Sequence, residues 1–167
     1  IRLFYDYLKY DENINLTNPV RRNLRLRAPK PLPRSLRPQE VAQLIDAIDS
    51  MRDMAMFKLM LRCGLRVEEV AKLTVGAVDL KGRRILVRQG KGGKDRVVYI
   101  SDDAADALNA YLKTRSHYRA KKVFLVERGK YKGQPISVRG IQKRMEYYAK
   151  QTGIKVSCHR LRHTMAT

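Results

Sequence analysis

Apolar residues recur at helical spacing along most of this chain. Val41, Leu44, Ile45 and Ile48 share one face of a helix that begins at Pro38, because proline suits a first helical turn. The spacing and the capping residues predict further helices over 1–10, 53–63, 67–73, 102–116, 138–152 and 158–167. Gly64 and Gly153 are placed to end two of these helices, since glycine accepts the backbone conformation that closes a helix.

Alternating apolar residues mark a different structure in the middle of the chain. Ile85 and Val87 form one such run, and Val97 and Tyr99 form another. The glycine-rich segment 89–95 lies between them, so the pattern predicts a β-hairpin with a long tip. Residues 123–126 are a candidate for one more short strand. The expected fold is α+β and mainly α-helical, with a small antiparallel sheet.

Composition divides the chain into three parts. Residues 1–18 are expected to be the end of a helical domain, and residues 38–167 a second domain. The linker between them, 19–37, contains prolines and many cations but no acidic residue, and includes Arg21, Arg22 and Arg25. Proline keeps such a segment extended, so these cations are expected to lie along a phosphate backbone. The alternative is a flexible tether without a ligand.

The net charge of +20, from 36 Lys+Arg against 16 Asp+Glu, makes nucleic acid the expected partner. An anionic membrane surface is the rival, although the sequence contains no apolar run long enough to cross a membrane. Cys63 and Cys158 stand alone, which is typical of reduced thiols and predicts a cytoplasmic protein. The first residues lack a methionine and are typical of mid-helix sequence, so we expect the chain to begin inside a longer protein.

The first cluster with chemical potential is Gly64-Leu65-Arg66-Val67-Glu68-Glu69. Arg66 follows a predicted helix break, and Glu69 is three residues later, close enough on a helix to orient it. A guanidinium held in this way offers a planar fork to a phosphate. The alternative is an ordinary surface ion pair.

The second cluster is the hairpin tip, Gly90-Lys91-Gly92-Gly93-Lys94. It is not a Walker motif, because Lys94 is followed by Asp95 and a strand rather than by Ser or Thr and a helix. A lysine on such a tip can instead donate a proton to a leaving oxygen or bind a phosphate. The alternative is a solvated turn lysine.

The third cluster is Ser157-Cys158-His159-Arg160-Leu161-Arg162-His163. His159 and Arg162 share a face at a helix start, where free N–H groups attract phosphate. Histidine and arginine there can stabilise a pentacoordinate phosphorus by hydrogen bonds and charge. His159 and His163 have the spacing of zinc-binding histidines, but Arg160 replaces the glutamate of zinc proteases and two arginines oppose a cation, so no metal is expected. The alternative is that these side chains only pack against the core or carry surface charge.

Together the three clusters resemble the tyrosine recombinases, the phage-integrase and Xer-like enzymes. Residues 61–73 resemble their first arginine motif, 87–100 their catalytic lysine hairpin and 157–167 their second conserved box. Residues 1–38 resemble the last helix of the core-binding domain and the interdomain linker, so the resemblance covers nearly the whole chain. The combination of Gly-Leu-Arg-x-x-Glu with His-x-x-Arg-His is specific, whereas each half alone is weak.

The resemblance implies site-specific DNA recombination or integration through a phosphotyrosine intermediate, without metal or nucleotide cofactor. Arg66 and Arg162 would bind the non-bridging oxygens of the scissile phosphate, and His159 would assist proton transfer. Lys91 would be the general acid, with Lys94 as its rival. Glu69 and His163 would support the site, and Arg21, Arg22, Arg25, Lys94 and Arg96 would bind DNA. The partners implied are double-stranded DNA and three further copies in a homotetramer.

One departure from the family pattern is large. The family's nucleophilic tyrosine lies well downstream of the second box, yet this chain stops at Thr167 and no tyrosine follows Arg162. Tyr147 and Tyr148 precede the box, and their apolar neighbours favour a packing role. We therefore expect this fragment to fold and hold DNA without cutting it, and the parent gene to continue and encode the tyrosine.

Two other functions compete with a recombinase fragment. The first is a DNA-binding relative of the integrases that never cleaves. The second is an unrelated basic RNA-binding protein, which the low aromatic content of 7% and the absence of tryptophan disfavour, because RNA-binding sheets stack bases on aromatic side chains.

Overall fold

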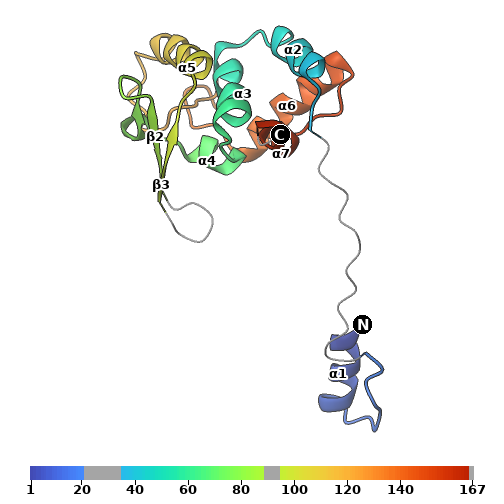
Figure 1. Cartoon of the computed structure of the whole chain (residues 1–167). Coiled ribbons are helices and arrows are strands. Elements are labelled where there is room, and N and C mark those ends of the chain that lie inside the picture. The colour runs from blue at the N-terminus through green and yellow to red at the C-terminus, as the bar shows by residue number, and fades with distance from the viewer. Residues whose placement is uncertain (21–34, 89–94, 166–167) are drawn as a thin grey trace. The chain divides into compact units, whose positions relative to one another are not determined.

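The computed structural model describes residues 1–20, 35–88 and 95–165, and the chain divides into two compact units, Ile1–Leu32 and Pro33–Thr167 (Figure 1). The first unit contains α1, Arg2–Tyr10, as the sequence predicts. No residue of α1 is buried, and Leu3 and Phe4 are 84% and 60% exposed. Asn18 closes the following turn by donating hydrogen bonds to the Arg2 carbonyl and the Asp6 carboxylate.

The second unit is mainly helical, which confirms the predicted fold class. Figure 1 shows α3 at its centre, with α5 and the sheet on one side and α2, α6 and α7 on the other. Nine residues of α3 are buried, so this helix is the core of the unit. The helices are α2 (Pro38–Asp46), α3 (Met51–Cys63), α4 (Val67–Lys72), α5 (Asp102–Thr114), α6 (Val138–Thr152) and α7 (Cys158–Met165), with a 3-10 turn at Val75–Ala77.

The sheet is antiparallel, with β1 (Val78–Asp79), β2 (Arg84–Val87) and β3 (Arg96–Tyr99) in the order β1-β2-β3. The predicted hairpin is confirmed for its strands, which pair Val87 with Arg96, while its tip lies outside the described residues. Ile85 and Val87 are buried, and Tyr99 on β3 is 76% exposed. The alternation therefore places one face of β2 against the core and leaves one face of β3 in contact with solvent.

The prediction of a strand over residues 123–126 is wrong. Val123, Phe124 and Leu125 are buried, but the backbone forms only isolated bridges, Leu125–Pro135 within the segment and Thr74–Lys122 just before it. Its hydrogen bonds go in different directions: Val123 donates to Leu73, whereas Val126 donates to Gln134. The apolar run therefore indicates burial, and its residues do not form a continuous ladder of strand hydrogen bonds.

Capping residues place the helix ends. The Ser50 hydroxyl accepts from the Asp53 amide, so α3 begins at Met51, two residues before the predicted start. Ser137 accepts from Gly140 at the start of α6, as expected, and Ser157 accepts from Arg160 at the start of α7. Ser101 precedes α5, but its hydroxyl donates to the Asp103 carboxylate instead of accepting from the backbone.

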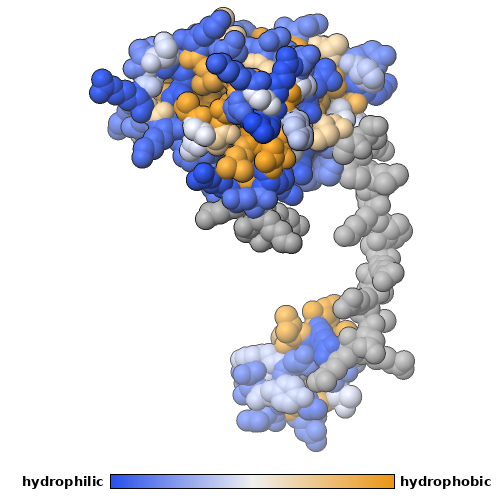
Figure 2. Space-filling view, turned by 60° about the vertical axis from the view of Figure 1, so that its left-hand side comes forward, coloured by the Kyte–Doolittle hydropathy of each residue, from blue (hydrophilic) through white to orange (hydrophobic). Residues whose placement is uncertain are grey.

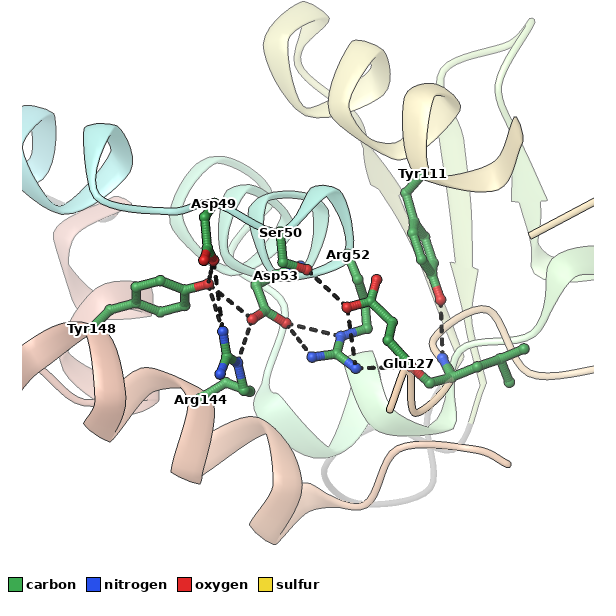
Figure 3. A network of polar contacts seen from close by, with 9 residues as sticks. Asp49, Ser50, Arg52, Asp53, Tyr111, Glu127, Arg144 and Tyr148 are labelled. Carbon is green, nitrogen blue, oxygen red and sulfur yellow. Dashed lines mark hydrogen bonds and ion pairs between the residues drawn. The ribbon is translucent and has the colours of Figure 1, made fainter. Parts of the chain in front are cut away.

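A polar network joins α3 and α6 beside the core (Figure 3). Asp53 is fully buried and forms ion pairs with Arg52 and Arg144, at 2.7 and 2.5 Å. The Tyr148 ring packs edge-on against Phe57, as its predicted packing role requires. Its hydroxyl, however, lies 3.1 Å from the Asp53 carboxylate, so the side chain is not surrounded by apolar groups alone.

Burial and the neighbouring carboxylates raise the pKa of Tyr148 well above its usual range. Its hydroxyl is 2.7 Å from the Asp49 carboxylate, and this hydrogen bond lowers the pKa of Asp49. A buried phenol held neutral by carboxylates is poorly suited to be a nucleophile. The geometry therefore agrees with the view that Tyr148 is structural.

Figure 2 shows a face of the second unit on which apolar residues gather inside a largely hydrophilic surface.

Within the part of the chain that the structure describes, no helix combines the length and the apolar character needed to cross a membrane.

Candidate active site

A cavity of about 710 Å³ opens between α4, the end of β2 and the start of α7. It brings together residues that are distant in the sequence, among them both predicted phosphate-binding arginines. The side chains of predicted importance that line it are Arg66, Glu69, His159, Arg162 and His163. Two of the three sequence clusters therefore meet at one cleft.

The end of α3 places Arg66 at this cleft. Gly64 closes the helix in the left-handed conformation, with φ of 63°, and the buried Leu65 follows. Arg66 is then extended and becomes the N-cap of α4. The left-handed backbone at position 64 is strained for other residues, so glycine suits this helix end.

The Glu69 carboxylate holds the Arg66 backbone and side chain in place. It accepts from the Arg66 amide at 2.7 Å and from the Arg66 guanidinium at 3.0 Å. It also accepts two hydrogen bonds from Arg96 on β3, at 2.7 and 2.9 Å. Burial alone would raise the pKa of Glu69, but these hydrogen bonds outweigh it and lower the pKa to about 2.

The helix α7 contributes the histidines and the second arginine. The Nε2 atoms of His159 and His163 are 2.7 Å apart, so one ring donates a hydrogen bond to the other. Arg162 is half-buried, and burial lowers its pKa, as do the positive charges of Arg66 and Arg96. Like charges gathered in a partly dehydrated cleft are stabilised by a bound anion, which is the chemistry that a phosphate supplies.

Several predicted residues cannot be placed. Arg21, Arg22, Arg25, Lys91 and Lys94 lie outside the described residues. Arg96 is described, and its guanidinium pairs with Glu69, whereas the sequence suggested a role in DNA binding alone.

Lys72 and Arg88 also line the cleft, although no sequence motif marks them as site residues. Their only sequence signal is their position beside the first and second clusters. Across the described residues, no group of three or more His, Cys, Asp or Glu side chains is placed to hold a metal ion.

The sequence of this domain matches a known family over most of its length. Residues 34–167 match the model of the phage integrase family. The tyrosine recombinase XerA of Pyrococcus horikoshii is 33% identical over 171 residues, which cover the whole chain and 57% of that relative. The tyrosine recombinase XerC of Actinobacillus pleuropneumoniae is 35% identical over 176 residues, covering the whole chain and 55% of that relative.

Solved structures show the same fold. The crystal structure of a XerA recombinase aligns with a TM-score of 0.74 and 32% identity, over 83% of this chain and 51% of that one. The Tn1549 transposon integrase, in complex with a circular intermediate DNA, aligns with a TM-score of 0.71 at 18% identity, over 97% of this chain and 61% of that one.

The fold and the cleft define a recombinase-type catalytic domain, helical with a small sheet. The chain belongs to the phage integrase family. It spans a little more than half the length of the curated relatives that it matches.

Proposed function

We propose that the complete protein is a site-specific tyrosine recombinase, and that this chain supplies its phosphate-binding site. The observation that carries the proposal is the convergence of Arg66, His159 and Arg162 on one cleft. The Tn1549 integrase and the XerH recombinase among the structural neighbours were solved with DNA, which supports duplex DNA as the partner. We place the activity in the cytoplasm and the reaction in a homotetramer on two DNA sites.

In the proposed reaction a tyrosine oxygen attacks the scissile phosphorus, His159 assists the transfer of the tyrosine proton, and the bond to the 5′-oxygen breaks. Arg66 and Arg162 neutralise the charge that grows on the non-bridging oxygens, and His159 donates a hydrogen bond to the same group. Lys91, with Lys94 as its alternative, gives a proton to the leaving 5′-oxygen. The 3′-phosphotyrosyl bond keeps the energy needed for rejoining, so no nucleotide cofactor is needed, and the cationic side chains take the place of a metal ion at the phosphate.

A suicide DNA substrate tests this function. The complete gene product should form a covalent adduct with a nicked duplex that loses its 5′-hydroxyl fragment after cleavage. We expect the adduct on denaturing gels and the modified tyrosine in a peptide that follows Arg162 in the sequence. A protein that binds the duplex tightly but never forms the adduct would instead be a DNA-binding relative without cleavage.

Binding of the 167-residue chain to duplex DNA should weaken steeply with salt. Each phosphate contact releases counterions, so we expect affinity to fall about a hundredfold or more between ~50 and ~200 mM salt. Fluorescence anisotropy would measure the slope. Replacing Arg21, Arg22 and Arg25 together by alanine should lower the slope by roughly one for each lost contact. An unchanged slope would show that the linker does not bind the backbone.

A further inference from the structure

Arg96 lies beside the cleft, and the proposed reaction gives it no role. It lies on β3, paired with Val87 of β2, and reaches α4 from the sheet. Its guanidinium donates a hydrogen bond to each carboxylate oxygen of Glu69. This bidentate geometry gives an arginine–carboxylate pair its strength and direction. The same two oxygens hold the backbone and the side chain of Arg66.

The contacts form a chain from the sheet to the cleft. Arg96 fixes the plane of the Glu69 carboxylate, and that carboxylate fixes the Arg66 guanidinium. The Glu69 side chain is 9% exposed, against 39% for Arg66, so the buried carboxylate links a supporting arginine to a cleft arginine. Without Arg96, the carboxylate would have no second cation and would be free to rotate toward Arg66 or toward solvent.

The charges of these residues also link Arg96 to the cleft. Arg66 and Glu69 carry opposite charges and would cancel if they stood alone. Arg96 restores a net positive charge of one to this group of three residues. The positive charges of Arg66 and Arg96 both act on Arg162, the second cleft arginine, so the group lies within electrostatic range of the phosphate position.

We infer that Arg96 is a positioning residue for the cleavage step: it acts through Glu69 to orient Arg66 toward the scissile phosphate and to keep the cleft cationic. The inference rests on the proposed function, because it assigns Arg96 to the same reaction. It differs from a DNA-binding role, in which Arg96 would contact the backbone itself and leave Glu69 paired with Arg66 alone.

Substrate chemistry can separate this role from a structural one. The test uses the complete protein and two suicide duplexes, one with a normal scissile phosphodiester and one with a methylphosphonate there. The methyl group replaces a charged non-bridging oxygen, so the linkage is uncharged and has less need of a correctly placed arginine. Single-turnover cleavage rates at saturating protein give the effect on the chemical step separately from DNA binding.

On the phosphodiester, Arg96→Gln should cleave about a hundredfold more slowly than the unchanged protein, because a small misplacement of a catalytic group costs about that much. On the methylphosphonate, the same variant should cleave nearly as fast as the unchanged protein. Arg66→Ala should show the same pattern with a larger loss on the phosphodiester. Arg96→Lys keeps the charge but not the bidentate fork, so its loss should be smaller than that of Arg96→Gln.

The matched control is Arg84→Gln, which breaks an exposed ion pair with Asp79 in the same sheet and should cleave both substrates normally. If Arg96→Gln is equally slow on both substrates, or normal on the phosphodiester, the positioning role is overturned. If Arg66→Ala itself cleaves the phosphodiester normally, the proposed function fails and the inference fails with it. The inference alone fails when Arg66→Ala behaves as expected and Arg96→Gln does not.

Discussion

Replacing Arg66 or Arg162 by alanine should lower the rate of covalent DNA adduct formation by about a hundredfold to a thousandfold, the loss typical of one missing transition-state contact. Both side chains line the cleft, and each would face a phosphate whose charge increases during cleavage. The measurement is single-turnover cleavage of a suicide duplex by the complete protein. The double variant should lose less than the product of the two single losses, because both arginines act on one phosphate.

Arg62→Ala is the matched control for these variants. Arg62 is an arginine of α3 that pairs with Asp103 at 3.1 Å and does not line the cleft. It removes one positive charge from the same domain, so it corrects for the general loss of DNA attraction. Adduct yields that stay at the level of the unchanged protein in both cleft variants would refute the phosphate-binding assignment.

Asp53→Ala should lower the free energy of unfolding by about 3–5 kcal/mol, the usual cost of removing one partner from a buried ion pair. The substitution removes the 2.7 Å counter-charge of Arg52, which is 6% exposed, and leaves it only the more distant Glu127 carboxylate at 3.8 Å. It also removes the carboxylate that binds Arg144 of α6. Such a loss is a large share of the stability of an ordinary domain, so urea unfolding should show a much lower midpoint.

Asp79→Ala is the comparison for this prediction. Asp79 also pairs with an arginine, Arg84, but both side chains are about half exposed, at 46% and 56%. An exposed pair contributes about 1 kcal/mol or less, so this variant should unfold close to the unchanged protein. If the two variants lost equal stability, burial would not be what makes the Asp53 network important.

Local signals in the sequence were sufficient for most of the fold. The helices of the second unit follow from apolar spacing and from Ser137, Gly64 and Gly153, whose effects are confined to adjacent turns. The strand expected over 123–126 failed because an apolar run indicates burial and does not say which partners its backbone will find. That choice depends on segments such as 134–136, which are brought near only by the complete fold.

The sequence likewise predicts some residues of the candidate site and not others. The arginine and histidine motifs were visible because their residues are close in the sequence. The pairing of Arg96 with Glu69 joins residues 27 positions apart, and that of Arg144 with Asp53 joins residues 91 apart. An arginine that follows a lysine-containing hairpin tip is typical of DNA contact, and only the packing of the sheet against α4 reveals its carboxylate partner.

The contacts of Glu69 also decide which proton transfers the site can support. A carboxylate has about four lone-pair positions, and the donors from Arg66 and Arg96 fill four of them. With a pKa of about 2, this carboxylate is also a very weak base at neutral pH. In the proposed reaction Glu69 is therefore not the base for the attacking hydroxyl, and the other bases along the cleft are the Glu68 carboxylate and the imidazoles of His159 and His163.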